Sequence, residues 1–217
     1  MDNIPPHLRE IVPDTLTVAA PDWWAKYGLV AAGYNAPPAP TVRAFAQTDP
    51  RWNTDRMGGT AQTIGGWGCA MCCACMVYSQ RDPATNPQTF NAILSAHGGY
   101  NVLNGEAHLA WERLPQMTPE LQWLGRKDWT RRLTTAELAD VLAKIAARPL
   151  ILWVDYKPQT AAMDTHFVLA LAANDTGTDV RILDPIDGAE AWLLQRYAAV
   201  GHDLARAIWG YRELVTA

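Results

Sequence analysis

Three apolar segments in the C-terminal half decide the fold: Leu150-Ile151-Leu152-Trp153-Val154, His166-Phe167-Val168-Leu169-Ala170-Leu171 and Val180-Arg181-Ile182-Leu183-Asp184. Each has the length of an ordinary strand and is rich in apolar residues, several of them β-branched or aromatic. The polar stretch Asn174-Asp175-Thr176-Gly177 is typical of a turn and joins the second segment to the third. The sequence therefore predicts adjacent strands of an antiparallel sheet.

Two helices are predicted upstream of these strands by the residues at their starts. Asn86 and Pro87 suit the N-cap and the first position of one helix. A second helix runs from Thr134 to about Ala147, because Thr134 and Glu137 have capping-box spacing and apolar residues follow at the helical period. Helices that are followed by a sheet indicate an α+β domain.

The predicted hairpin brings a histidine close to a carboxylate. If the turn is centred on Asp175, His166 stands directly opposite Asp184, with Cβ atoms about 5 Å apart. At that separation the carboxylate can accept a hydrogen bond from the imidazole and fix its tautomer, whereas a slip of one residue would put the two on opposite faces. The alternatives are a histidine with only local hydrogen bonds and an aspartate that serves the turn at 184–188.

Cys69 is the candidate nucleophile. It follows the glycine-rich stretch Gly65-Gly66-Trp67-Gly68 and begins an apolar run that predicts a helix. At a helix N-terminus, unpaired backbone N–H groups and the positive end of the helix dipole favour a thiolate. Cysteine catalysis also requires a base, which His166 and Asp184 would supply together.

The other three cysteines, Cys72, Cys73 and Cys75, lie in the same predicted helix. Four cysteines within seven residues cannot link distant parts of a domain by disulfides, so we expect reduced thiols. A zinc site is one alternative. On a helix, however, Cys75 would point away from Cys69, and the surrounding residues are apolar, so we favour small buried core residues and expect no metal.

Several blocks of the chain form a pattern in a fixed order: Gln47-Thr48-Asp49-Pro50-Arg51-Trp52, Gly58-Gly59, Ile64-Gly65-Gly66-Trp67-Gly68-Cys69-Ala70 and Ala74-Cys75-Met76-Val77. Asn86-Pro87, Gly98-Gly99-Tyr100, the His166 strand and residues 184–188 continue it. Over about residues 45–190 the sequence resembles the C39-like cysteine peptidase family. The resemblance implies a papain-like α+β fold, in which N-terminal helices, one of them beginning at the nucleophile, pack on a C-terminal antiparallel sheet.

The resemblance also implies roles for four residues. Cys69, His166 and Asp184 would form a Cys-His-Asp triad, and Gln47 would form the oxyanion hole with the backbone N–H of Cys69. In the members that cut double-glycine leaders, the glutamine lies only a few residues before the cysteine, whereas here the interval is 22 residues. The chain therefore looks like the broader subgroup of the family, and no cofactor is expected.

The expected function is cleavage of peptide or amide bonds, above all in bacterial cell-wall peptidoglycan, as by a phage endolysin or a virion-associated lysin. Three alternatives stay open: an intracellular peptidase that processes a protein precursor, a binding module that keeps the scaffold without turnover, and a zinc-binding or redox thiol protein. Trp67, two residues before Cys69, is the candidate substrate-binding residue, because aromatic faces bind both peptides and glycans.

Composition and patterning limit the partners and the compartment. A net charge of −4 without a cluster of Lys or Arg does not favour binding to nucleic acid or to an anionic membrane. No apolar stretch reaches membrane-spanning length, so we expect no membrane insertion. The N-terminus lacks the pattern of a signal peptide, so we expect synthesis in the cytoplasm. The protein would then be released to the cell wall by another factor or carried in a virion. The Pro-rich segment Ala36-Pro37-Pro38-Ala39-Pro40 predicts an extension over residues 1–40, ahead of a single peptidase domain at 41–217.

Overall fold

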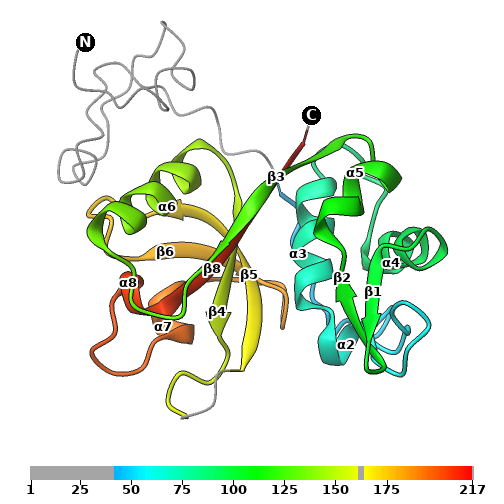
Figure 1. Cartoon of the computed structure of the whole chain (residues 1–217), viewed down its shortest axis with the longest axis horizontal. Helices are drawn as coiled ribbons and strands as arrows, with labels where there is room; N and C mark the ends of the chain where they lie inside the picture. Colours follow the sequence, from blue (N-terminus) through cyan, green and yellow to red (C-terminus); the bar gives the residue numbers. More distant parts are fainter. Residues whose placement is uncertain (1–41, 161–163, 217) are drawn as a thin grey trace, which may run out of the picture.

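The computed structural model describes residues 42–160 and 164–216 (Figure 1), so the predicted extension over residues 1–40 lies outside the described residues. The described part is a mixed α+β structure with a six-stranded antiparallel sheet, as predicted. Its first half contains α2 (Ile64–Trp67), α3 (Cys69–Tyr78), α4 (Pro87–Ala96), β1 (Tyr100–Leu103), β2 (Glu106–Leu109), the 3-10 helix η2 (Trp111–Arg113) and α5 (Leu114–Met117). Its second half contains β3 (Leu121–Asp128), α6 (Thr135–Ala147), β4 (Leu150–Asp155), β5 (Thr165–Ala173), β6 (Val180–Asp184), β7 (Ala189–Trp192), α7 (Leu193–Tyr197), α8 (Leu204–Ala207) and β8 (Ile208–Thr216).

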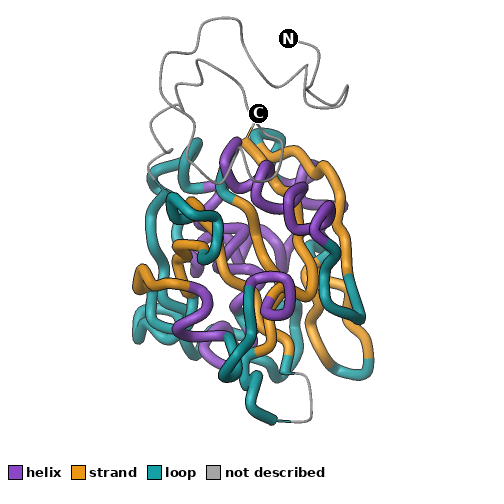
Figure 2. Tube along the Cα trace, turned by 90° about the vertical axis from the view of Figure 1, so that its left-hand side faces the viewer, coloured by secondary structure: helices purple, strands orange, loops and turns teal. Residues whose placement is uncertain are grey.

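The sheet separates two hydrophobic cores. Its strand order is β3-β8-β4-β5-β6-β7, with α3 on one face and α6 on the other (Figure 1), and the turned view of Figure 2 shows helical segments in front of the strands. Because side chains alternate along a strand, Phe167 and Leu169 of β5 enter the core beneath α3, whereas Val168 enters the core beneath α6. Strand β5 therefore belongs to both cores.

Both helix starts predicted from capping residues are confirmed. The Asn86 side chain accepts from the backbone N–H of the third helical residue of α4, and Thr134 does the same at α6, where Glu137 completes the capping box. α6, the longest helix of the described residues, has 13 residues. Nowhere in the described part of the chain is a helix long and apolar enough to cross a membrane.

The predicted register of the β5–β6 hairpin is wrong by two residues. Leu169 pairs with Leu183 and Ala170 with Ile182, and an irregularity between Ala170 and Ala172 shifts the pairing of the strand ends near the turn. Continued outward, this register sets Asp184 opposite Val168 rather than His166. A slip of two residues returns each side chain to its original face, so the two functional side chains still share one face as diagonal neighbours.

The predicted order of helices first and sheet second is also incomplete. Strand β3 precedes α6 and pairs with the C-terminal strand β8 at one edge of the sheet, and the hairpin β1–β2 lies within the helical half. Strand β3 has a polar sequence, Leu-Gln-Trp-Leu-Gly-Arg-Lys-Asp, that is mostly exposed at the sheet edge and includes an irregularity between Trp123 and Gly125. An edge strand of this kind lacks the apolar run by which the central strands were predicted.

Candidate active site

Cys69 is the first residue of α3, and Gly68 is its N-cap. A Cβ on Gly68 would lie 2.5 Å from the carbonyl oxygen of Ile64, so a glycine is needed where α2 ends and α3 begins. The thiol of Cys69 is partly exposed, and it sits at the N-terminus of a ten-residue helix, as predicted. The first backbone N–H groups of a helix have no intrahelical acceptor, so they remain available near this thiol.

His166 and Asp184 form a buried pair. The Nε2 atom of His166 lies 3.1 Å from Oδ1 of Asp184, and the two residues are 3% and 0% exposed. The thiol of Cys69 also acts on this imidazole and favours its protonated form. Because Nε2 is bound to the carboxylate, the other ring nitrogen, Nδ1, is left for the thiol. The structure thus brings together the three residues predicted as nucleophile, base and orienting acid.

The pair is held in its charged form. Burial opposes a charge on His166, but the interactions with Asp184 and Cys69 outweigh this effect and raise its pKa to about 9. Burial likewise opposes a charge on Asp184, yet hydrogen bonds from His166 and Tyr197 hold the pKa of Asp184 well below its usual range. At neutral pH the site therefore contains an imidazolium beside a carboxylate.

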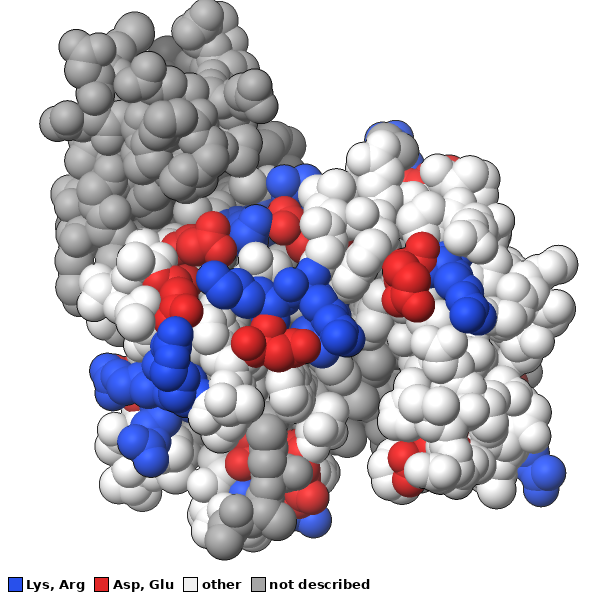
Figure 3. All heavy atoms as spheres, viewed as in Figure 1, with Lys and Arg blue, Asp and Glu red and all other residues white. Residues whose placement is uncertain are grey.

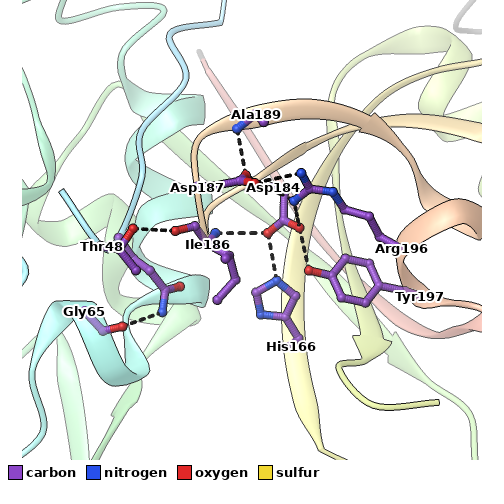
Figure 4. A network of polar contacts seen from close by, with 10 residues as sticks. Thr48, Gly65, His166, Asp184, Ile186, Asp187, Ala189, Arg196 and Tyr197 are labelled. Carbon is purple, nitrogen blue, oxygen red and sulfur yellow. Dashed lines mark hydrogen bonds and ion pairs between the residues drawn. The ribbon is translucent and has the colours of Figure 1, made fainter. Parts of the chain in front are cut away.

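Asp184 has three further partners, none of them identified from the sequence (Figure 4). Its Oδ1 atom also accepts from the backbone N–H of Ile186 at 3.0 Å. Its Oδ2 atom accepts from Tyr197 Oη at 2.5 Å and from Arg196 Nη1 at 2.6 Å, and Arg196 extends to Asp187 as well. Arg196 and Tyr197 are supplied by α7, which packs against β6 and β7. No spacing in the sequence pairs them with Asp184, because this contact depends on how α7 folds back.

Two tyrosine rings enclose His166. The centroids of Tyr156 and Tyr197 lie 5.3 Å and 5.2 Å from that of the imidazole, and the two tyrosine rings lie 6.2 Å from each other. Tyr197 is buried, whereas Tyr156 is 41% exposed and lines the cleft described below. The rings restrict water at the imidazole and limit its rotation.

Gln47 is buried beside the glycine-rich stretch. Its backbone N–H donates to the carbonyl of Pro185 at 2.5 Å, and its Nε2 atom donates to the carbonyl of Gly65 at 2.9 Å. The side-chain amide carries a second N–H, and Gln47 lines the same cleft as Cys69. The backbone hydrogen bond explains why the residue is held here, since it ties the N-terminal segment to the loop that follows Asp184.

A cleft of about 1400 Å³ lies beside these groups, and Asp184, Arg196 and Tyr197 are not part of its lining. The predicted residues Gln47, Trp67, Cys69 and His166 line it, and Trp67 is 61% exposed there. The rest of its lining includes further aromatic side chains, namely Trp111, Trp123, Trp153 and Phe167. On the face drawn in Figure 3, a hollow lies between the helical half and the sheet half.

Cys72, Cys73 and Cys75 are fully buried in the core beneath α3, as predicted. Burial raises the pKa of each of these thiols, which keeps them protonated at neutral pH. Among the described residues, no three histidine, cysteine, aspartate or glutamate side chains converge as metal ligands would. Cys69 is thus the one cysteine of the four that reaches the cleft.

The chain was compared with protein-family models, curated proteins and solved structures. None of these comparisons gives a match, so the interpretation of the site rests on its own geometry.

Proposed function

We propose that the protein is a cysteine peptidase or amidase of papain-like fold, with Cys69 as nucleophile, His166 as base and Asp184 as orienting acid. The observation that carries the proposal is the position of His166, which bonds to a buried carboxylate through Nε2 and lines the same cleft as the partly exposed Cys69. A thiol, an imidazole and a carboxylate in this order are the groups that acyl transfer by cysteine requires.

The reaction has two halves. The Sγ thiolate of Cys69 attacks the carbonyl carbon of the substrate, and the tetrahedral intermediate collapses to a thioester as the imidazolium of His166 gives its proton to the leaving amine. Neutral His166 then takes a proton from water, and the resulting hydroxide attacks the thioester. The carboxylic acid is released, the thiolate is regenerated and the proton remains on His166.

The negative charge that develops on the carbonyl oxygen needs donors. The backbone N–H of Cys69 has no intrahelical acceptor, and the side-chain amide of Gln47 has a second N–H beyond its bond to Gly65. These two groups are the proposed oxyanion hole. Loss of one such donor typically lowers kcat by about 10²–10³.

The proposed substrates are peptide bonds of bacterial cell wall. This part of the proposal rests on the resemblance of the sequence to the C39-like family, and it is supported by a cleft of about 1400 Å³ that is lined by aromatic side chains. Trp67 is the proposed contact nearest the nucleophile. A peptidase that processes a protein precursor would use the same chemistry.

The decisive experiment compares the purified full-length protein with Cys69→Ala on cell-wall preparations and on a peptide library, and identifies the cleaved bond from product masses. We expect Cys69→Ala to lose all measurable cleavage, whereas Cys75→Ala, a matched change at a buried cysteine, keeps it. Equal cleavage by the wild type and Cys69→Ala would contradict the proposal. Cleavage of library peptides without cleavage of cell wall would support the peptidase function but contradict the proposed cell-wall substrate. Binding without cleavage would indicate a binding module.

Two further variants assign the roles. Gln47→Ala should lower kcat by about 10²–10³ with little change in KM, because the lost donor acts on the transition state. Iodoacetamide should modify one thiol, Cys69, in the folded protein, and His166→Ala should slow that labelling as well as cleavage. Full activity in His166→Ala would refute the triad even if Cys69 were confirmed as the nucleophile.

A further inference from the structure

Two arginines line the sheet side of the cleft. Arg212 on β8 and Arg126 on β3 stand opposite each other in the strand register, and both contribute to the cleft surface. Arg212 is 6% exposed, whereas Arg126 is exposed at the rim. Positive and negative side chains both border the hollow on the face drawn in Figure 3. Neither arginine takes part in the proposed chemistry at Cys69.

The guanidinium of Arg212 is embedded in the aromatic wall of the cleft. It lies 5.4 Å from the ring centroid of Phe167 and 5.8 Å from that of Trp153. Its hydrogen bonds come from Nη1, to Asp128 and to the carbonyl of Tyr211. Its Nε atom, like Nε1 of Trp153, is buried without a hydrogen-bond partner among the described residues. Two buried donors behind the cleft surface thus lack acceptors, which is costly in a buried position.

The charges of Arg126, Arg212 and Asp128 do not cancel. Asp128 is the acidic partner of both arginines, through its contact with Arg212 and through a 3.7 Å ion pair with Arg126. Two guanidiniums share one carboxylate, which leaves one positive charge. Burial lowers the pKa of Arg212 below its usual range, opposed by Asp128, and the charge of Arg126 lowers it further. A guanidinium stays protonated under such conditions, so its charge favours an anion next to Arg212, in a cleft whose lining elsewhere includes Glu106, Glu112 and Asp164.

We propose that Arg212, assisted by Arg126, binds a carboxylate of the peptide substrate and so makes the enzyme prefer substrates that present a carboxylate at this position. This inference rests on the proposed peptidase function. The planar guanidinium suits a carboxylate in two-point contact. The stacked rings of Trp111 and Trp123, with centroids 5.9 Å apart, and the ring of Phe167 against Trp111 form an apolar surface beside it. The fitting group is therefore a carboxylate on an apolar stem, either a glutamate or aspartate side chain or a C-terminal carboxylate.

The test uses a peptide that the wild type cleaves, synthesised with Glu or Gln at each position near the cleaved bond and with a free or an amidated C-terminus. We expect the wild type to prefer the carboxylate form at one position by about tenfold or more in kcat/KM, mainly through KM. A Glu preference and a free-terminus preference distinguish the two sources of the carboxylate. Arg212→Gln should reduce this ratio toward one, and Arg126→Gln should reduce it in part.

Two control variants separate recognition from folding. Asp128→Asn breaks the ion pair with Arg212 but leaves the arginine, so this variant should retain or increase the preference for the carboxylate peptide. If the ion pair had a purely structural role, Asp128→Asn would instead behave like Arg212→Gln. Arg131→Gln removes an exposed arginine that pairs with Glu137 outside the cleft and should leave the ratio unchanged. Cleavage by the wild type without a carboxylate preference, or a preference that survives in Arg212→Gln, would overturn the proposal.

If the wild type cleaves no peptide, the proposed peptidase function is refuted, but the proposed carboxylate site at Arg212 is not. Calorimetric titration then decides, with acetyl-Ala-Ala-Glu-Ala-Ala-amide and its Gln counterpart as the probes. Tighter binding of the Glu peptide by the wild type than by Arg212→Gln would support the carboxylate site. Equal binding of both peptides, or no binding, would overturn it.

Discussion

Asp184 accepts four hydrogen bonds at a position with no solvent exposure, from His166, Ile186, Arg196 and Tyr197. A carboxylate without water is strongly destabilised unless each oxygen is satisfied and a positive charge lies close by. Both conditions are met here, because each oxygen has two donors and Arg196 forms an ion pair with Oδ2. The imidazole is thereby oriented by an anion that cannot rotate away.

Replacement of one of these donors gives a prediction for a single residue. Tyr197→Phe removes the hydrogen bond to Oδ2 but keeps the ring that packs on His166, so the pKa of Asp184 should rise and the acidic limb of the pH–activity profile should shift to higher pH. The free energy of unfolding should fall by about 1–3 kcal/mol. The matched control is Tyr100→Phe, which breaks a buried 2.7 Å bond to Asn91 away from the site. It should lower stability without changing the pH profile, and an identical profile in both variants would count against the role of Tyr197.

The raised pKa of His166 predicts how stability depends on pH. The folded protein holds this proton up to about pH 9, whereas the ordinary pKa of histidine is 6.5, so the proton stabilises the fold fully below about pH 6.5 and this contribution is lost as the pH rises through 9. Under reducing conditions, the free energy of unfolding should fall by about 1–3 kcal/mol between pH 6.5 and 9. Urea unfolding at several pH values measures it. His166→Gln cannot titrate and should show a flatter profile, and equal slopes would refute the assignment.

Among the elements, the four-residue helix α2 positions the side chain of Gln47. It begins at the N-cap Thr63, its first turn contacts the loop at Asn53, and the carbonyl of Gly65 accepts from the Gln47 side chain. A Cβ on Gly65 would lie 2.8 Å from the carbonyl oxygen of Asn53, whereas a Cβ on Gly66 would meet nothing closer than 3.6 Å. Adjacent glycines of one helix therefore differ in whether they can carry a side chain.

This difference predicts opposite results for two similar substitutions. Gly65→Ala should force α2 away from Asn53, lower the free energy of unfolding by about 1–3 kcal/mol and lower kcat, because Gln47 moves with its acceptor. Gly66→Ala should leave stability unchanged or raise it by up to about 1 kcal/mol, since alanine is the better helix former. Urea unfolding and cleavage rates measure both variants. Similar losses in the two would show that the contact with Asn53 is not what fixes α2.

For the whole molecule, β5 contributes buried side chains to both cores, as do β4, β6 and β8. Leu169 is buried beneath α3, and its neighbour Val168 is buried beneath α6. A loss on either face of this strand should weaken both halves, because neither core is complete without it.

Leu169→Ala should therefore lower the free energy of unfolding by about 2–5 kcal/mol through the cavity that it leaves. Hydrogen exchange followed by mass spectrometry should show the same loss of protection in α3 and in α6. Val200→Ala, at a fully exposed position, should change stability by less than about 0.5 kcal/mol. A loss confined to α3 would mean that the two halves unfold independently.

The fold was predictable where local sequence and tertiary environment agree. Thr134 with Glu137 and Asn86 with Pro87 start helices by hydrogen bonds within four residues, and the apolar strands are buried on both faces, so each carries its own signal. Strand β3 does not, because a polar edge strand is defined by its partner β8 rather than by its residues. The register of β5 and β6 was missed because the turn pairs Ala173 with Val180, three residues away from the predicted pairing. The irregularity at 170–172, which has no sequence signature, then reduces the offset to two residues.

The sequence by itself pointed to Cys69, His166 and Asp184, because a glycine-rich helix start and a hairpin are local features. It pointed to Gln47 only through the resemblance of several blocks of the chain to a known family. Only the tertiary structure decided that the histidine meets the aspartate as a diagonal neighbour, that Arg196 and Tyr197 complete the shell of that aspartate, and that Arg212 lies in an aromatic cleft. These contacts join residues from different strands and helices. Their geometry depends on strand register and helix packing, which arise from burial summed over the whole domain rather than from any short segment.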